Sequence, residues 1–505
     1  MKNMKKEIEK LKKRLNEISY IGSLLALAAW DQEVHMPAKG TDARATAISY
    51  LSATIHNKFI SINRDGLLTK LVKAVNAGKI KGENAVIVSE TWRTWSREKK
   101  LPEKFVKELS ETCSKAQSVW AKARKDDDFG LFLPWLKKIV ELKREEAKYV
   151  GYTESPYDAL LDAFEPGMTA REVSEIFEGF KVFLIPFLKK IRESKVKINA
   201  KKAKGCFPID TQKTFNEYIA KSIGFDFEAG DMSVSTHPFA SGFHPYDVRL
   251  TTRYKEEDML CALGSTIHET GHGLYEQGLP AEHFGTPLGE SVSLGIHESQ
   301  SRMWENIIGK SMPFWKHFYQ KLQKQFPKPF KKMPLGEFYR IINRVSPSLI
   351  RTESDEVTYN LHVILRFEIE KAMIEGKIKL ENLPKIWNAK MKEYLGVDVP
   401  NDTLGVLQDV HWSTGGIGYF PTYSLGNLYS AQFYSAMKRD IPNIDQKISK
   451  GKFKEILLWL RKNIHSHGKT YRANDLVKKV TGENLNCKYW NDYMEKKYGE
   501  IYSKI

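Results

Sequence analysis

The chain of 505 residues is long enough to bury a large core, and its hydrophobic fraction of 41% with an aromatic fraction of 11% excludes a disordered protein. Its formal net charge of +17 raises the question of an acidic partner. The lysines alternate with glutamates along helical patterns, as in KKEIEKLKKRLNE near the start, and such charges usually form a solvated helix face. We therefore expect no nucleic-acid partner.

The four cysteines lie far apart, and no two of them have the C-x-x-C spacing of a redox or metal motif. They are predicted to be reduced, buried thiols. The positively charged N-terminus is not followed by the apolar segment and cleavage site of a signal peptide. No apolar run approaches the roughly 18 residues of a membrane span. Together these features predict a cytoplasmic protein with no membrane partner.

Apolar residues recur every three or four positions over most of the chain, a spacing that predicts α-helices. Thr169 and Glu172 have the spacing of a capping box, which predicts the start of one of these helices. Earlier helices are predicted at residues 5–30, 44–60, 67–96, 103–125 and 133–149. Later helices are predicted at residues 355–374, 383–394, 424–439, 452–464 and in the C-terminal stretch.

The helical pattern is interrupted between residues 224 and 254. Residues 232–236 and 247–254 carry β-branched side chains in near alternation, which predicts two strands, and residues 349–352 are a candidate third. The sequence contains no linker, low-complexity tract or internal repeat, so a single domain over residues 1–505 is expected. The predicted fold is mainly α with a small β-sheet.

The pentapeptide His-Glu-Thr-Gly-His at residues 268–272 is the most informative motif. In a helix, His268 and His272 lie on the same face, close enough to bind one metal ion. Neutral imidazole is the commonest zinc ligand, and a carboxylate such as Glu269 beside a zinc-activated water can accept its proton. Gly271 and Gly273 are poor helix formers, so we expect a metal site or a strand to approach the helix closely there.

A zinc site of this kind needs a third protein ligand, and four acidic residues downstream are candidates. Glu276 lies on the same helix, where it would at best reach the edge of the site, and Glu282 and Glu290 lie in or near a loop rich in Gly and Pro. Glu298 follows His272 by 26 residues and lies in a predicted second helix, which leaves room for a loop and an antiparallel return. Position therefore favours Glu298.

Further motifs, in a fixed order along the chain, accompany this pentapeptide. The motifs are WDQEVHMP (30–37), HPF (237–239), DVRLT (247–251), HETGH (268–272), HESQSR (297–302), IRTESD (350–355), GVLQDVHW (405–412) and GYFPTYSLGN (418–427). Together they resemble the M32 metallocarboxypeptidases, the carboxypeptidase Taq or thermostable carboxypeptidase 1 family, over nearly the whole chain. One departure is Ser354, where the family usually has alanine, and it exchanges one small residue for another.

The resemblance implies a zinc-dependent, sometimes cobalt-activated, exopeptidase of the neurolysin-like helical fold. Such an enzyme has two helical lobes around a deep groove, with the small sheet beside the active site, and is usually a homodimer. It removes single residues from the C-termini of peptides with broad preference. The resemblance assigns His268, His272 and Glu298 as metal ligands and Glu269 as the general base.

A carboxypeptidase must recognise a terminal carboxylate, which a guanidinium group binds best in bidentate geometry. Arg351, at the end of the candidate third strand, matches the arginine that the family uses for this purpose. The structural alternative for Arg351 is a salt bridge with Asp355 or Glu353. Arg249 is a rival, but its position beside Asp247 in a strand favours a structural role.

Donors to the oxyanion of the tetrahedral intermediate are also needed. By resemblance to the wider group of such zinc peptidases, we predict catalytic roles for His411 and Tyr423. Tyr419 and His237 are predicted to bind substrate. The structural alternative for each of these four residues is simple packing.

Gln300 and Asp409 are candidates for orienting the metal ligands. Two other functions also fit parts of the sequence. An oligoendopeptidase or dipeptidase of the same helical zinc class would differ from a carboxypeptidase in its products. A basic helical scaffold with an unmetallated H-E-x-x-H motif would instead bind nucleic acid in a salt-sensitive way.

Overall fold

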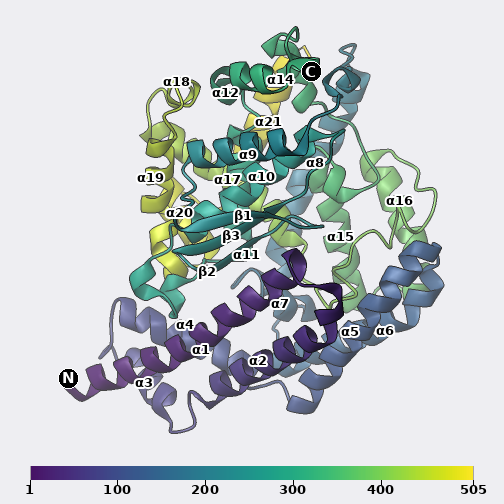
Figure 1. The fold of residues 1–505 in the computed structure, drawn as a ribbon. Helices are drawn as coiled ribbons and strands as arrows, with labels where there is room; N and C mark the ends of the chain where they lie inside the picture. The colour runs from purple at the N-terminus through teal and green to yellow at the C-terminus, as the bar shows by residue number, and fades with distance from the viewer. Residues whose placement is uncertain (1, 504–505) are drawn as a thin grey trace.

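The structure is a computed structural model that describes residues 2–503, and it is mainly helical, as the sequence predicts (Figure 1). The helices before the sheet are α1 (Lys2–Val34), α2 (Thr41–Ser61), α3 (Leu67–Asn76), α4 (Glu83–Glu98), α5 (Glu103–Asp126), α6 (Phe129–Val150), α7 (Pro156–Leu161), α8 (Ala170–Glu193) and α9 (Ile209–Ile223). Those after it are α10 (Met259–Glu276), α11 (Leu294–Arg302), α12 (Met312–Gln325), α13 (Pro327–Phe330), α14 (Leu335–Ile342), α15 (Tyr359–Ile374), α16 (Leu383–Leu395), α17 (Pro421–Asp440), α18 (Ile444–Ser449), α19 (Phe453–Asn463), α20 (Ala473–Thr481) and α21 (Lys488–Ile501).

A sheet of three strands lies against α10 (Figure 1). The strands are β1 (Gly230–Val234), β2 (Ala240–His244) and β3 (Asp247–Thr252), in the order β1-β3-β2. β1 is parallel to β3, and β2 is antiparallel to it. The two predicted strands are thus confirmed as β1 and β3. β2 was not predicted because its sequence, ASGFH, has little β-branched character, and Gly242 in it leaves room for the side chain of Glu276.

The predicted third strand at residues 349–352 is wrong. Arg351–Glu353 forms a 3₁₀ turn, η6, and the side chain of Gln408 takes the place of a partner strand. Its Oε1 accepts a hydrogen bond from the backbone N–H of Arg351 at 2.9 Å, and its Nε2 donates to the carbonyl of Leu349 at 3.0 Å. A segment with β-branched residues can therefore have backbone groups paired by a side chain, without belonging to a sheet.

Most predicted helices are confirmed, with two local errors. The predicted helix at 67–96 is two helices, α3 and α4, because Gly78 and Gly82 adopt positive φ angles of 67° and 62° between them. The predicted helix at 355–374 begins four residues later, at Tyr359. The carboxylate of Asp355 accepts hydrogen bonds from nearby backbone N–H groups and forms a turn before the helix.

Three glycines allow close contacts between backbones, and these contacts fix the place of the residues in the H-E-x-x-H motif. A Cβ atom on Gly271 of α10 would lie 2.6 Å from the Cα of Ser301 in α11, and one on Gly273 would lie 2.8 Å from the side chain of Leu250 in β3. On α17, a Cβ atom on Gly426 would lie 2.6 Å from the Cβ of Glu298. The close approach expected at the two glycines of α10 is confirmed: α11 approaches Gly271, and β3 approaches Gly273.

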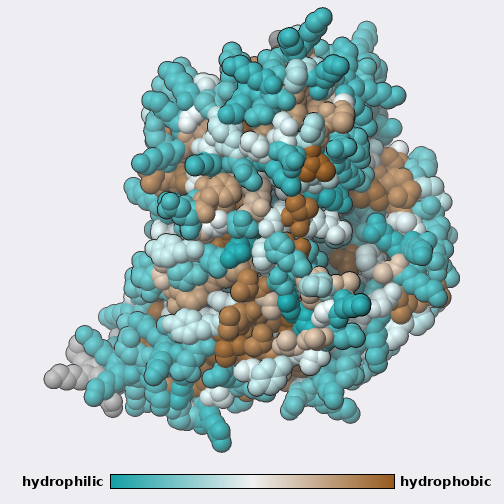
Figure 2. Space-filling model, viewed as in Figure 1, coloured by the Kyte–Doolittle hydropathy of each residue, from teal (hydrophilic) through white to brown (hydrophobic). Residues whose placement is uncertain are grey.

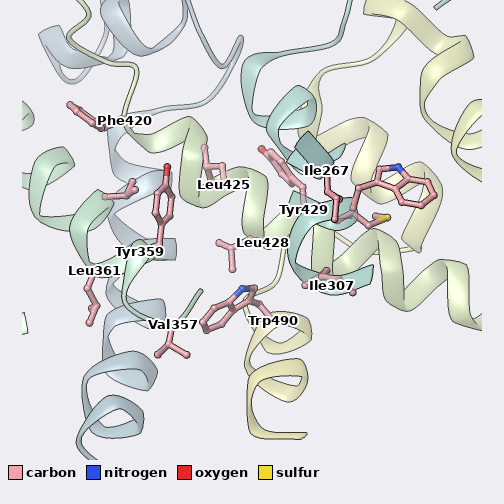
Figure 3. Close-up of a cluster of buried hydrophobic side chains, with 14 of the residues drawn as sticks. Ile267, Ile307, Val357, Tyr359, Leu361, Phe420, Leu425, Leu428, Tyr429 and Trp490 are labelled. Carbon is pink, nitrogen blue, oxygen red and sulfur yellow. The ribbon is translucent and has the colours of Figure 1, made fainter. Parts of the chain in front are cut away.

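The buried apolar side chains form two separate clusters. Figure 3 shows part of the larger one, with Tyr359 at the start of α15, Leu428 of α17 and Trp490 of α21. The smaller cluster joins α1, α3 and α4, with Leu11 and Leu71 among its members. The single domain over residues 1–505 stays a prediction.

The face of the molecule in Figure 2 is mostly hydrophilic, with a hydrophobic patch near the C-terminal half of α1 and smaller hydrophobic areas elsewhere. Leu24 and Leu27 of α1 are 59% and 37% exposed. Cys206 and Cys261 are also exposed, so the prediction of buried thiols is wrong for these two. The neighbouring helix α2 has no buried residue. None of the helices within residues 2–503 combines the length and the apolar content that a membrane crossing would require.

We expect Gly271→Ala to destabilise the protein by about 1–3 kcal/mol, because the added methyl group meets the backbone of α11, which cannot move without displacing Glu298. Gly264→Ala on the same helix is the matched control. Its Cβ atom meets nothing within 4 Å, so it should stabilise the protein by up to about 1 kcal/mol. Urea denaturation measures both free energies of unfolding. Equal effects of the two substitutions would contradict a tight contact at Gly271.

Candidate metal centre

Helices α10 and α11 bring three potential metal ligands to one point. His268 and His272 lie one turn apart on α10, and Glu298 lies on α11. Glu298 Oε2 is 3.7 Å from His268 Nε2 and 3.4 Å from His272 Nε2. One donor atom of each residue lies within 4.8 Å of the other two. The structure thus brings the predicted trio together, whereas Glu282 and Glu290 are exposed and outside it.

A carboxylate sets the tautomer of His268. His268 Nδ1 donates a hydrogen bond to Glu305 Oε2 at 2.8 Å, so that Nε2 carries the lone pair that a metal ion needs. Glu305 lies in η5 (Met303–Ile308), a short π-helix that continues α11. Because a π-turn shifts the register of the residues after α11, the spacing of a regular helix does not reveal that Glu305 faces His268.

A chain of two hydrogen bonds holds His272. Its Nδ1 lies 2.5 Å from Nδ1 of His297, and Nε2 of His297 lies 2.7 Å from Glu276 Oε1. Since the carboxylate accepts from His297 Nε2, His297 Nδ1 accepts from His272, and His272 Nε2 is left with its lone pair. Burial and the nearby His297 lower the pKa of His272 to about 3, so the ring is neutral. Glu276 therefore acts through His297, not as a ligand at the edge of the site.

Arg302 keeps the third candidate ligand, Glu298, ionised. Its Nε donates to Glu298 Oε1 at 2.6 Å, and Ser301 Oγ donates to Glu298 Oε2 at 3.1 Å. Burial alone would raise the pKa of Glu298, but Arg302 and His268 hold it well below its ordinary value. Nε2 of each imidazole and the carboxylate of Glu298 therefore face one another. This donor set fits a divalent cation such as zinc.

Glu269 is buried beside the three ligands, and no hydrogen bond joins its carboxylate to the described part of the chain. Burial raises the pKa of Glu269 to about 7, while the charges of His268 and Glu298 act on it in opposite directions. A carboxyl group with such a pKa and no fixed partner can both take up and release a proton near neutral pH.

The guanidinium group of Arg351 is buried and held from two sides. Its Nε and Nη2 donate to Asp409 Oδ1 at 3.1 and 2.9 Å, and its Nη1 donates to the hydroxyl of Tyr359 at 2.9 Å. The alternative salt bridge to Asp355 or Glu353 is wrong, because Asp355 binds backbone amides and Glu353 is exposed. Burial by itself would lower the pKa of Arg351, but Asp409, Tyr359 and Tyr423 raise it above its ordinary value.

Asp409 is shared by two arginines. Arg366 Nε and Nη2 lie 2.7 and 2.6 Å from Asp409 Oδ2, on the side away from Arg351. Two guanidinium groups and one carboxylate leave an excess positive charge in a buried place. The suggestion that Asp409 orients the metal ligands is wrong, because it orients Arg351. Gln300 is not in contact with the ligands either, since its Oε1 pairs with Nε2 of His465 at 2.9 Å.

The predicted aromatic residues gather next to Arg351. His411 Nε2 lies 3.1 Å from the hydroxyl of Tyr423, and the rings of Tyr419 and Tyr423 have centroids 5.2 Å apart. The guanidinium carbon of Arg351 lies 4.8 Å from the ring centroid of Tyr423. Burial lowers the pKa of His411 to about 4 and raises the pKa of Tyr419 to about 12. At neutral pH these groups are an uncharged imidazole and protonated phenols.

Two other residues considered from the sequence lie outside this cluster. The side chain of His237 is exposed in the loop between β1 and β2, and its backbone carbonyl accepts a hydrogen bond from Ser235. Arg249 donates to Asp247 at 2.6 Å and lies over the ring of Trp30, 5.0 Å from its centroid. The structural role predicted for Arg249 agrees with these contacts.

Four residues of the site have no signal of their own in the sequence. Arg302 and His297 belong to the HESQSR motif, but the motif does not say which atoms they contact. Glu305 is displaced by the π-helix, and Tyr359 lies at the start of a helix whose beginning was predicted too early. Only the packing of α10, α11 and α15 shows that they border the site.

Comparison with known proteins gives a consistent result over nearly the whole chain. A family model described as carboxypeptidase Taq (M32) metallopeptidase matches residues 9–498. Carboxypeptidase 1 of Bacillus subtilis is 40% identical over 488 residues, which are 97% of this chain and 97% of that protein. Thermostable carboxypeptidase 1 of Thermus thermophilus is 40% identical over 495 residues, covering 96% of this chain and 97% of that protein. The crystal structure of the M32 carboxypeptidase from Deinococcus radiodurans has a TM-score of 0.94 at 35% identity, over 99% of this chain and 100% of that one.

We expect His297→Ala to weaken zinc binding about 10- to 100-fold, because His272 loses the acceptor that orients its ring. Titration of the chelator-treated protein with zinc measures the affinity. His56→Ala, on α2, is the control and should bind zinc as the unchanged protein does. An unchanged affinity in His297→Ala would show that the hydrogen bond from His272 does not support the ligand.

Proposed function

The chain belongs to the carboxypeptidase Taq (M32) family and is a metallocarboxypeptidase, and from this premise we propose that it is a zinc enzyme that releases single residues from peptide C-termini with broad preference. The observation that carries the choice of zinc is the convergence of His268 Nε2, His272 Nε2 and Glu298 Oε2. Two imidazoles and one carboxylate are a frequent ligand set of catalytic zinc, whereas cobalt is the alternative metal. When bound, the ion polarises a carbonyl group and lowers the pKa of a water molecule to about 7.

Glu269 is the proposed general base. It is buried next to the ligands, has no hydrogen-bond partner in the described chain, and has a pKa raised by burial to about 7. Such a group takes a proton from the attacking water and returns it to the leaving amine. No other described carboxylate beside the trio is free in this way, since Glu305 and Glu276 are both bound to histidines.

Arg351 is the proposed site for the terminal carboxylate of the substrate. Its hydrogen bonds to Asp409 and Tyr359 use three of five N–H groups and leave one on each terminal nitrogen. Two parallel N–H groups match a carboxylate, and the excess positive charge next to Arg366 favours an anion. The C-terminus of a peptide would therefore bind at Arg351 through its carboxylate, whereas the middle of a peptide has no backbone charge to bind there.

His411 and Tyr423 are proposed to donate hydrogen bonds to the oxyanion, and Tyr419 to contact the substrate. Burial keeps both tyrosines protonated and His411 uncharged, so that each has one N–H or O–H group. The hydrogen bond between His411 and Tyr423 uses one of these hydrogens and must break before both residues donate to the oxyanion. Their position beside Arg351 supports this proposal. The substrate-binding role of His237 stays a prediction.

The oligomeric state and the location of the protein are also proposals. A homodimer agrees with the resemblance, and the exposed Leu24 and Leu27 on α1 offer an apolar surface for it. Light scattering would then report twice the chain mass of 58.1 kDa. A cytoplasmic location is tested by cell fractionation.

We expect Glu269→Gln to keep the metal and lose about 10²- to 10⁴-fold in kcat, because the amide cannot accept the proton of water. Metal analysis of the purified variant and steady-state kinetics on a blocked peptide measure the two effects. Chelation of the unchanged protein should abolish the same activity. Full turnover by Glu269→Gln would exclude Glu269 as the base.

We expect the unchanged enzyme to digest a free-acid peptide into a ladder that shortens by one residue at a time from the C-terminus, and to leave the corresponding C-terminal amide intact. Arg351→Ala should raise KM for the free acid and reduce the preference for acid over amide. Mass spectrometry of timed digests measures both. Internal cleavage would favour an oligoendopeptidase, and an undiminished preference for the acid in Arg351→Ala would remove Arg351 from this role.

A further inference from the structure

Tyr359 is the residue that connects the metal ligands to Arg351. It is the first residue of α15, and only 6% of it is exposed. Its hydroxyl accepts a hydrogen bond from Arg351 Nη1 at 2.9 Å, and its ring centroid lies 4.2 Å from the guanidinium carbon of Arg302. Arg302 in turn donates to Glu298 at 2.6 Å. A continuous series of direct contacts therefore joins a metal ligand to the carboxylate-binding arginine.

Each contact in this series resists displacement. Arg302 is held by Glu298 and Glu305, with its Nη1 donating to Glu305 at 3.1 Å, and these ion pairs keep it from following a movement of Tyr359. Arg351 is held by Asp409 on its other side. The ring centroid of Phe420 lies 5.4 Å from the guanidinium carbon of Arg351 and gives this group a further neighbour. The ring of Tyr359 is thus close to two guanidinium groups, with its centroid 4.2 Å from the guanidinium carbon of Arg302 and 5.7 Å from that of Arg351.

We propose that Tyr359 is a positioning residue that sets the distance between the metal ligands and Arg351, and thereby limits each cleavage to one residue. This inference rests on the proposed binding of the terminal carboxylate by Arg351. An extended chain advances about 3.3–3.6 Å per residue, so a shift of Arg351 by that distance would place the second peptide bond, not the last one, at the metal. Tyr359 prevents this shift on the metal side, and Asp409 prevents it on the other.

The hydroxyl and the ring of Tyr359 have separate tasks in this proposal. The hydroxyl accepts from Arg351 and fixes the direction of its free N–H groups. The ring provides the bulk between Arg302 and Arg351 and a face for both cations. Removing the hydroxyl alone should therefore loosen recognition of the terminal carboxylate, whereas removing the ring should also let a longer leaving fragment fit.

Tyr359→Phe and Tyr359→Ala test the proposal on a blocked pentapeptide with a free C-terminus. We expect Tyr359→Phe to raise KM about tenfold with little change in kcat, and Tyr359→Ala to release dipeptides besides single residues. Tyr319→Phe is the control, because it removes another buried hydroxyl, one that donates to the carbonyl of Met333, and it should behave as the unchanged enzyme. Metal analysis and circular dichroism of each variant verify that zinc and fold are retained.

The outcomes separate this inference from the function on which it rests. A single-residue ladder from the unchanged enzyme, with a raised KM in Tyr359→Phe and dipeptides from Tyr359→Ala, supports both. A ladder from the unchanged enzyme, with KM and product size unaltered in Tyr359→Phe, overturns the inference alone. A lower kcat in Tyr359→Phe at constant KM also overturns it, because that result indicates a general structural role. If the unchanged enzyme yields no single-residue ladder, the proposed function fails first.

Discussion

The candidate metal site depends on how closely three helix backbones approach one another. α11 passes so near α10 that a methyl group on Gly271 would collide with the backbone at Ser301, and α17 passes so near α11 that a methyl group on Gly426 would collide with Glu298. These two contacts leave Glu298 one position, facing the histidines of α10. Because backbone atoms cannot rotate out of the way as side chains can, the contact specifies the geometry of the ligands more strictly than side-chain packing would.

Around this contact, the hydrogen bonds divide the site into two regions of opposite charge. In the first region, the negative charge of the acidic residues is larger than the positive charge of Arg302, which suits a divalent cation. These acidic residues are Glu269, Glu298 and Glu305. In the second region, the two positive charges of Arg351 and Arg366 outnumber the single negative charge of Asp409, which suits an anion. A peptide end has a carbonyl to be polarised and a carboxylate to be bound, so the two regions match its two features.

Much of the fold and the centre of the site could be predicted from the sequence, because helical periodicity and the H-E-x-x-H spacing are local properties. Two predictions were wrong where a side chain replaced a backbone partner. Gln408 forms the hydrogen bonds that a neighbouring strand would form with residues 349–351. Asp355 accepts hydrogen bonds from backbone amides at the start of the predicted helix. The roles suggested for Gln300 and Asp409 failed for a related reason. Both are polar groups close in sequence to functional residues, but their partners, His465 and two arginines, come from distant segments.

The sequence by itself determined which residues can bind a metal ion, because the identity of the donor atoms and their spacing on one helix need no tertiary information. It also determined the family, since its motifs lie in order along nearly the whole chain. Only the tertiary structure decided the tautomers of His268 and His272, through Glu305 and His297, and the partner of Arg351. The physical reason is that a hydrogen bond depends on a distance of about 3 Å between groups, and that distance is set by helix packing, which local patterns do not encode.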